Sequence, residues 1–372
     1  MTLDRARLST LLLVAATAIA LPRAVAAQNG GPNLRVAIVG LEHGHVEGFL
    51  SALPSHHDVE LVGIADADSS LIDKYQQRFH LDGRLFYKSE ANMIERVHPD
   101  AVLVYTPISE HRHAIGIAAQ YGVSSMVEKP LTISYDDALA IREIASYHHV
   151  HVLVNYETTW YPSNHEAYNE LERGQLGELR RLLVNDGHQG PKEIGVPPEF
   201  LDWLTDPAQN GAGALYDFGC YGVDLATWLM RGEAPLTVTA VVNHDKPNEY
   251  PHVDDDATIV LQYPRAQAVI EPSWNWPFGR KDMEVYGATG YAITVGADKL
   301  RVRYRNDRDE TTTTAPPLNS NERDSLSYLA AVLQGSIRGE GDPSSLDTNV
   351  TVMRILDAAR ESARTGKTIQ LR

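Results

Sequence analysis

Short apolar runs alternate with longer amphipathic stretches along the first half of the chain. The runs are rich in valine, isoleucine and leucine and are bounded by glycine, proline or aspartate, which is typical of buried strands. The stretches between them carry apolar residues at helical spacing. Strands that alternate with helices in this way indicate βαβ units and a parallel sheet covered on both faces. The predicted strands are 34–40, 60–65, 86–87, 101–105, 123–127 and 151–155, and the predicted helices are 44–50, 69–79, 110–121 and 134–147.

The pattern changes after Asn155, where short strands begin to follow one another directly. Such a run favours an open, mostly antiparallel sheet. We therefore predict an α/β chain with a Rossmann dinucleotide-binding domain over 33–155 and a substrate and oligomerisation domain over 156–372. In the second domain we expect helices at 162–172, 216–230, 325–333 and 349–365, strands at 179–184, 237–243, 257–263, 266–274, 282–286, 292–295 and 300–304, and surface loops at 187–210 and 305–321.

The first residues have the order of a secretory signal peptide. Arg5 and Arg7 precede an apolar run over 8–21, and small residues follow at 24–27. That run is short for a membrane span, and the order predicts a signal peptide over 1–27. The alternatives are an uncleaved anchor or a start placed too early. We expect an exported protein, periplasmic or secreted, with no membrane segment in its mature form.

The net charge of the chain limits the classes of molecule that it can bind. The formal net charge is −16 at pH 7, which argues against nucleic acid and anionic lipid as partners. A neutral small molecule is compatible with this charge. The only cysteine is Cys220, so no disulfide can form within one chain.

The first predicted strand ends in a turn that resembles a dinucleotide-binding turn. Gly40 closes the strand, and Asp66 closes the second strand, where an acid can accept hydrogen bonds from a ribose. No arginine follows Asp66, which favours NAD over NADP. The glycine signature is incomplete, because Glu42 and His45 replace its second and third glycines and Gly44 is one position off. His43 and His45 could act as donors to a phosphate instead; a plain turn that binds no nucleotide is the alternative.

Met126-Val127-Glu128-Lys129-Pro130 ends the fifth predicted strand. A residue before proline is restricted to extended backbone, so Lys129 should leave the strand in a defined direction. Ligands of open α/β sheets bind at the carboxyl ends of the strands. Lys129 is therefore a candidate active-site residue, and a surface pair of Glu128 and Lys129 is the alternative.

Three motifs in order resemble one enzyme family. They are Thr106-Pro107-Ile108-Ser109-Glu110-His111, Glu128-Lys129-Pro130, and the stretch Gly211-Ala212-Gly213-Ala214-Leu215-Tyr216-Asp217-Phe218-Gly219-Cys220-Tyr221. Together they resemble the glucose-fructose oxidoreductase, inositol dehydrogenase and rhizopine catabolism (Gfo/Idh/MocA) family. The resemblance covers nearly all of the chain after the leader.

The resemblance implies an NAD(P)-dependent oxidoreductase that acts on a CH–OH group of a sugar, cyclitol or related polyol. It also implies that Lys129 is the active-site lysine and Asp217 its acidic partner. The resemblance further places four residues on the cofactor side: Thr106, Pro107, His111 and Glu128. Tyr221 stands where inositol dehydrogenase-like members have histidine, which resembles the branch with glucose-fructose oxidoreductase, dihydrodiol dehydrogenase and xylose dehydrogenase.

Asp217 and Tyr221 are four residues apart, so they should share one face of a helix that continues to Asp224. Hydride transfer from an alcohol needs a base, and a nearby ammonium would lower the pKa of a tyrosine. The hypothesis is that Tyr221 exchanges the proton with the substrate hydroxyl. Lys129 would lower the pKa of Tyr221 and bind the substrate oxygen, and Asp217 would hold Lys129 and Tyr221 in place. The alternative is that Tyr221 packs in the core.

Aromatic residues of the second domain could form a platform for a sugar. We assign Trp160 and Trp203 to the substrate site, whereas Trp274 and Trp276 could equally be one buried face of a strand. We assign no metal ligand: the tract His148-His149-Val150-His151 is too compact for one ion without an unusual turn. Cys220 is interpreted as buried packing.

Export limits the supply of soluble cofactor, so we expect NAD (NADP is the alternative) to be tightly bound. Two other functions stay open: a redox-neutral NAD-dependent glycoside hydrolase or eliminase, and a non-catalytic sugar- or nucleotide-binding protein. By analogy with the family, a homodimer or homotetramer is expected.

Overall fold

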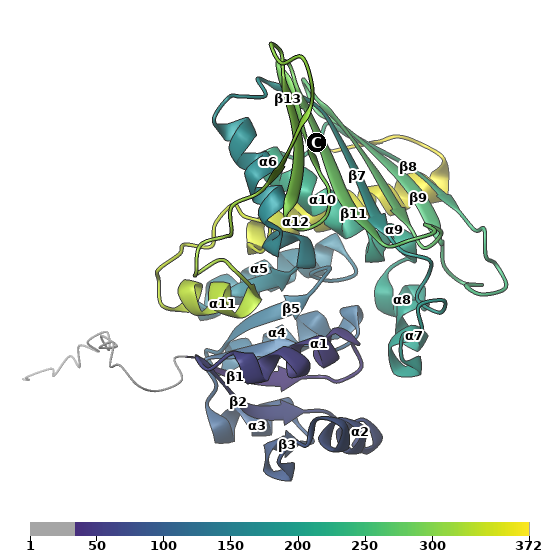
Figure 1. Cartoon of the computed structure of the whole chain (residues 1–372). Coiled ribbons are helices and arrows are strands. Elements are labelled where there is room, and N and C mark those ends of the chain that lie inside the picture. The colour runs from purple at the N-terminus through teal and green to yellow at the C-terminus, as the bar shows by residue number, and fades with distance from the viewer. Residues whose placement is uncertain (1–33, 372) are drawn as a thin grey trace, which may run out of the picture. The chain divides into compact units, whose positions relative to one another are not determined.

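The computed structural model describes residues 34–371 (Figure 1). The predicted signal peptide lies outside the described residues. Within those residues, no helix is both long enough and apolar enough to cross a membrane.

A parallel sheet of six strands forms the first part of the described chain. Its order is β3-β2-β1-β4-β5-β6, so the direction of winding reverses between β1 and β4, where open α/β sheets place their ligands. The strands are β1 (Leu34–Val39), β2 (Val59–Ala65), β3 (Phe86–Tyr87), β4 (Ala101–Val104), β5 (Ser124–Glu128) and β6 (Val152–Asn155).

Five α-helices connect these strands, which confirms the predicted Rossmann arrangement. One of them, α3 (Glu90–Val97), was not expected from the sequence. Ser89 caps it by accepting from the Asn92 N–H, and Met93 and Ile94 face the core. Its apolar residues Met93, Ile94 and Val97 lie on one face, so the segment is amphipathic but only eight residues long. The other helices are α1 (His45–Ala52), α2 (Ser69–Phe79), α4 (His111–Gln120) and α5 (Tyr135–His148).

A second sheet of nine strands follows, in the order β14-β13-β12-β11-β7-β10-β9-β8-β15. All of its neighbours are antiparallel except β7 and β10, which confirms a mixed, mostly antiparallel sheet. The strands are β7 (Leu179–Gly187), β8 (Thr237–Asn243), β9 (Asp256–Gln262), β10 (Gln267–Ser273), β11 (Arg280–Gly287), β12 (Gly290–Thr294), β13 (Lys299–Tyr304), β14 (Thr311–Thr314) and β15 (Ile369–Gln370).

Helices α6 (Pro162–Glu172), α10 (Gly219–Leu229) and α12 (Leu346–Thr365) pack against the second sheet, and α12 also contacts α5 of the first (Figure 1). Two predictions were wrong here. The expected surface loop 305–321 contains β14, because its threonines pair with β13. The expected loop 187–210 contains the short helices α7 (Pro198–Leu204) and α8 (Pro207–Asn210). Helix α11 (Ser325–Leu333) lies where it was expected.

The predicted single helix over 216–230 is also wrong. It is divided into α9 (Ala214–Asp217) and α10, with Phe218 between them. The Asp254 side chain accepts from the N–H groups of Gly213 and Leu215 and so fixes the start of α9. A Cβ at Gly213 would lie 1.8 Å from the Asp254 carbonyl oxygen. This close approach sets α9 in place, and Asp217 therefore ends one helix instead of lying inside another.

Candidate active site

A buried ion pair joins the two sheets. Lys129 follows directly after β5, and its Nζ donates to Asp217 Oδ1 at 2.5 Å and to the Asp217 carbonyl oxygen at 3.1 Å. Both side chains are only 6% exposed. The Trp274 Nε1–H donates to Asp217 Oδ2 at 2.9 Å. Asp217 is thus held from the first domain by Lys129 and from the second sheet by Trp274.

Burial alone would favour the neutral form of both members of this pair. Burial is the largest single influence and lowers the pKa of Lys129, but the combined attraction of Asp217, Cys220 and Glu128 raises it overall. Burial is likewise the largest single influence on Asp217 and raises its pKa, but Lys129, His188 and the Trp274 hydrogen bond together lower it overall. The site therefore carries an ammonium that faces a carboxylate, and Lys129 is a charged hydrogen-bond donor.

Tyr221 lies beside this pair, in the first turn of α10. The Lys129 Nζ is 5.2 Å from the centre of its ring, and the Lys281 Nζ is 4.7 Å from it. Burial is the largest cause that raises the pKa of Tyr221 well above its ordinary value. The expectation that an ammonium lowers this pKa is wrong for this structure, because the cations approach the ring face while the phenol is buried.

A cavity of about 560 Å³ opens beside the ion pair. Lys129, Asp217 and Tyr221 lie in its wall, together with His45, the first residue of α1. The second domain adds charged and polar side chains to this wall. They are Glu157, Tyr161, His188, Arg280 and Lys281.

Glu157 and Lys281 are site residues that sequence analysis missed. The Lys281 Nζ contacts Glu157 Oε2, and the Tyr161 hydroxyl donates to Glu157 Oε1 at 2.5 Å. Glu157 lies just after β6 and Lys281 lies on β11. No local pattern relates two residues so far apart in the chain; only the fold brings them to one wall.

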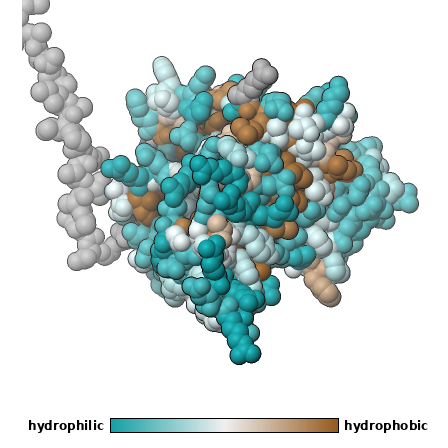
Figure 2. Space-filling view, turned by 90° about the horizontal axis from the view of Figure 1, so that it is seen from above, coloured by the Kyte–Doolittle hydropathy of each residue, from teal (hydrophilic) through white to brown (hydrophobic). Residues whose placement is uncertain are grey.

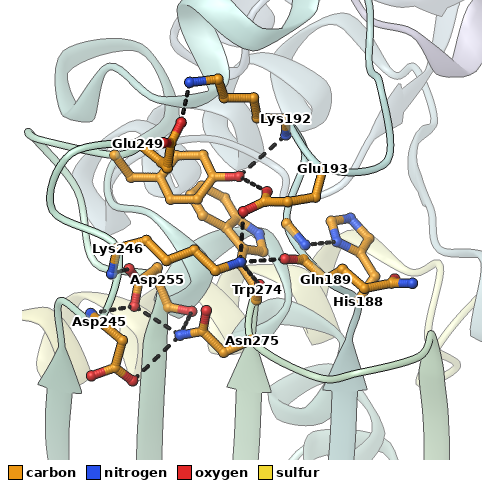
Figure 3. A network of polar contacts seen from close by, with 12 residues as sticks. His188, Gln189, Lys192, Glu193, Asp245, Lys246, Glu249, Asp255, Trp274 and Asn275 are labelled. Atoms are coloured by element: carbon orange, nitrogen blue, oxygen red, sulfur yellow. Dashed lines mark hydrogen bonds and ion pairs between the residues drawn. The ribbon is translucent and has the colours of Figure 1, made fainter.

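The loop that lines the cavity after β7 is anchored to the second sheet (Figure 3). The Lys246 Nζ contacts the Gln189 carbonyl oxygen, donates to the Trp274 carbonyl oxygen at 2.9 Å, and lies 2.7 Å from Glu193 Oε1. The Tyr250 hydroxyl also contacts Glu193. Lys246 therefore connects the cavity loop to Trp274, the residue that holds Asp217.

The predicted tryptophan platform lies away from this cavity. Trp203 is 3% exposed and packs against Phe200 and His43, with ring centres 5.0 Å and 5.3 Å apart. Trp160 packs against Tyr328, and its Nε1–H donates to Asn155. Neither residue lines the cavity, so the structure does not support the assignment of Trp160 and Trp203 to the substrate.

The turn after β1 has the tight glycine and the acidic residue that a dinucleotide site requires. Gly40 has φ +84°, and a Cβ there would lie 2.7 Å from the Thr106 backbone nitrogen, so only glycine allows this approach. Asp66 Oδ2 accepts from the Leu41 N–H at 2.8 Å, and Oδ1 accepts from the Asp68 N–H at 2.7 Å. The acid thus holds the turn and retains acceptor capacity for a ribose.

Glu42 occupies the phosphate side of this turn. Its Oε2 is buried and has no hydrogen-bond partner within residues 34–371. Burial and the nearby Asp66 raise its pKa to about 7. A protonated Glu42 could donate a hydrogen bond to a phosphate oxygen. This bond would remove the expected repulsion between carboxylate and phosphate, and it would give the buried Oε2 a partner. The turn therefore fits a dinucleotide, although its glycine signature is incomplete.

The remaining predicted cofactor residues lie along the same edge. Thr106 donates to the Pro107 carbonyl oxygen at 3.1 Å. His111 is buried, and its Nδ1 donates to the Leu131 carbonyl oxygen at 3.1 Å; burial lowers the pKa of His111 to about 4, so its ring is neutral. His111 therefore supports the segment after Lys129. Phe200 of α7 covers Gly44, where a Cβ would lie 2.7 Å from its ring.

Comparisons with known proteins agree with this geometry. Residues 34–156 match the oxidoreductase family with an NAD-binding Rossmann fold, and residues 165–293 match the GFO/IDH/MocA C-terminal domain. D-apiose dehydrogenase of Paraburkholderia graminis is 26% identical over 84% of this chain and 83% of its own length. A dTDP-3,4-didehydro-2,6-dideoxy-alpha-D-glucose 3-reductase of Saccharopolyspora spinosa is 26% identical, and this chain covers 64% of its length.

The fold is also similar to that of a solved enzyme. The aldose-aldose oxidoreductase of Caulobacter crescentus, crystallised with glycerol, superimposes with a TM-score of 0.77 at 23% identity, over 91% of this chain and 99% of that one. The two family matches together span more than half of the chain and both halves of the described fold. The chain belongs to the GFO/IDH/MocA family of NAD-binding oxidoreductases.

Proposed function

We propose that this protein interconverts a secondary alcohol and a ketone on a sugar, cyclitol or related polyol. The observation that carries the proposal is the ion pair of Lys129 and Asp217, which is buried, charged and open to a 560 Å³ cavity. A charged ammonium in a site of low dielectric stabilises the negative charge that develops on the oxygen of the reacting carbon. The named relatives that act on sugars support the same substrate class.

Each site residue then has one task. Lys129 donates to the reacting oxygen, and Asp217 fixes the direction of the ammonium. The neutral Tyr221 phenol gives a proton to the developing alkoxide in the reducing direction and takes it back in the oxidising direction. A nicotinamide, when bound, supplies or accepts the hydride. Gly40, Glu42, Asp66 and Thr106 would hold the dinucleotide.

The proposal includes NAD as the preferred cofactor. Asp66 and Asp68 stand at the end of β2 with Ala67 between them. A 2′-phosphate would meet two carboxylates there, and no arginine follows to accept it. The cover that Phe200 forms over the turn, together with the contact between Lys74 of α2 and Glu199 of α7, supports slow release of the cofactor.

The first experiment is to denature the purified protein and assay the released small molecules for NAD(H) and NADP(H). The protein as purified is then incubated with a panel of aldoses and cyclitols. Released NAD(H), with net conversion of one polyol to its ketone, is the expected result. If no nucleotide is released and none is taken up from solution, the non-catalytic alternative is favoured and the proposal fails.

A second function is favoured by the cluster of Lys281, Glu157 and Tyr161. The Lys281 Nζ lies 4.7 Å from the centre of the Tyr221 ring, and the cluster supplies a second acid–base group to the cavity. Simple hydride transfer needs one such group, whereas a redox-neutral glycoside hydrolase or eliminase also moves a proton at a neighbouring carbon. Cleavage of a chromogenic glycoside without net NADH formation would support this function.

Export and assembly are also proposals. Leader removal is tested by mass spectrometry of the mature N-terminus after cell fractionation; an intact Met1 in the cytoplasm would contradict it. The hydrophobic residues seen in Figure 2 are interspersed with hydrophilic ones, and exposed apolar side chains of the second domain include Leu236, Val241 and Phe278. We infer a homodimer or homotetramer by analogy with the family, and light scattering that shows a monomer would refute it.

A further inference from the structure

Three potential metal ligands meet at the carboxyl edge of the first sheet. His43 lies on the turn after β1, His45 is the first residue of α1, and Glu128 is the last residue of β5. One ligand atom from each residue lies within 4.8 Å of the other two. The His45 Nδ1 is 2.8 Å from Glu128 Oε2. The two stretches are far apart in the sequence, and the sheet order brings them together.

The types of ligand are those of a known class of metal site. Two imidazoles and one carboxylate bind divalent first-row ions such as Zn²⁺, Fe²⁺, Mn²⁺ and Co²⁺, and they leave further coordination positions open. Thiolates, which would select softer ions, are not part of the cluster. The three ligands come from a short turn, the first residue of a helix and the end of a strand.

Glu128 is held in place by groups outside the cluster. The Asn155 Nδ2 donates to Glu128 Oε1 at 2.9 Å, and the Trp160 Nε1–H donates to Asn155 Oδ1 at 3.0 Å. These hydrogen bonds occupy Oε1 of the Glu128 carboxylate, and Oε2 faces His45. Such outer hydrogen bonds orient ligands in metal sites. Trp160 therefore helps to orient Glu128 through Asn155, a different role from the predicted contact with a sugar.

His43 provides a second, independent observation. It is 1% exposed, its Nδ1 accepts from the His45 N–H at 3.2 Å, and its Nε2 finds no partner among the described residues. A pair of His45 and Glu128 alone would explain one hydrogen bond but not a buried imidazole with unused bonding capacity next to it. The His45 side chain is 46% exposed, so it is free to turn toward an ion.

We propose that His43, His45 and Glu128 bind one divalent first-row transition-metal ion at the rim of the active-site cavity. His45 lines that cavity together with Lys129, so the open positions of the ion face the space available to a substrate. This inference goes beyond the oxidoreductase function and does not depend on it. It predicts a binding stoichiometry that is measured without an activity assay.

The test uses tag-free mature protein as purified, with the nucleotide content of the same sample recorded. The metal content is measured by mass spectrometry, the protein is dialysed against EDTA, and CoCl₂ is added while the visible spectrum is followed. We expect one equivalent of Co²⁺ to bind per chain, with a change in its visible absorption, and Zn²⁺ to displace it.

The matched variants are His45→Ala, Glu128→Gln and His43→Ala, with His113→Ala as the control. His113 is an exposed histidine on α4. The three cluster variants should weaken Co²⁺ binding at least ~10-fold, and Asn155→Ala should weaken it by about 10-fold through loss of orientation. If His43→Ala does not fold, as shown by its circular dichroism, His45→Ala and Glu128→Gln decide. Absence of the cobalt spectrum in the wild type, or unchanged binding in both of these variants, overturns the proposal.

Discussion

Lys129 Nζ lies 2.5 Å from Asp217 Oδ1, although the two residues belong to different domains and are 88 positions apart. Both side chains are buried, so each charge depends on the other for its stability. The same contact places an ammonium at the wall of the cavity. Its loss should therefore affect both catalysis and folding.

Replacing Lys129 with methionine removes the ammonium and retains most of the side-chain volume. We expect kcat to fall by at least ~10³-fold, because the developing oxyanion loses its charged donor. The unpaired Asp217 should lower the free energy of unfolding by about 3–5 kcal/mol. The double variant Lys129→Met/Asp217→Asn is the control: urea denaturation should show it more stable than the single variant. Wild-type turnover in Lys129→Met would contradict the assignment.

Replacing Tyr221 with phenylalanine removes the proposed proton donor and keeps the ring. The ring packs edge-on against Tyr156, with centres 5.5 Å apart, and should stay in place. We expect kcat to fall by about 10²–10⁴-fold with an unchanged melting temperature.

Tyr156→Phe is the matched control, because the Tyr156 hydroxyl donates to Asn349 Oδ1 at 2.9 Å in the core. This variant should lose about 1 kcal/mol of stability and keep its turnover. If the two variants show equal rates, Tyr221 is a packing residue.

Lys281 and Glu157 should act mainly in substrate binding. They line the same cavity as Lys129, and the Lys281 Nζ lies 4.7 Å from the centre of the Tyr221 ring. Lys281→Met should raise KM about 10-fold or more and change kcat less, since the lost hydrogen bonds to a polyol exist before and during hydride transfer. Steady-state kinetics on the identified substrate measures this split. Arg265→Met, an exposed cation of the same sheet that pairs with Glu178, is the control. A fall in kcat alone would instead assign Lys281 to the chemical step.

Glu90 predicts a pH dependence of stability. Its Oε1 is buried without a hydrogen-bond partner in the part of the chain that is described, and burial raises its pKa to about 8 from 4.5. Between these two values the unfolded state loses the proton while the folded state keeps it. Rising pH therefore destabilises the protein through Glu90, and above about pH 8 the loss is complete.

The substitution Glu90→Gln removes the loss of stability that Glu90 causes as the pH rises. Its stability advantage over the wild type should grow from pH 5 to pH 8 by up to about 4 kcal/mol, at about 1.4 kcal/mol per pH unit, and then stay level. Thermal unfolding at a series of pH values measures the difference. Glu95→Gln, an exposed position of the same helix, should show no such trend. A constant difference for Glu90→Gln would refute the shifted pKa.

Local sequence patterns determined the order of elements and the class of fold. Runs of apolar residues with period two or with helical period reflect which face is buried, and this is a property of neighbouring residues. For the same reason Lys129 and Asp66 were predicted at the carboxyl ends of their strands. The strand β14 was missed because its four threonines are all exposed and leave no alternating pattern. The helix α3 is amphipathic but spans only eight residues.

The tertiary structure alone decided the chemistry of the site. The break before α10 places Asp217 against Lys129, and it depends on the distant Asp254. Burial of the phenol sets the protonation state of Tyr221, so it reversed the expected direction of its pKa shift. Distances and desolvation depend on contacts between residues far apart in the chain, and hydrophobic periodicity carries no information about them.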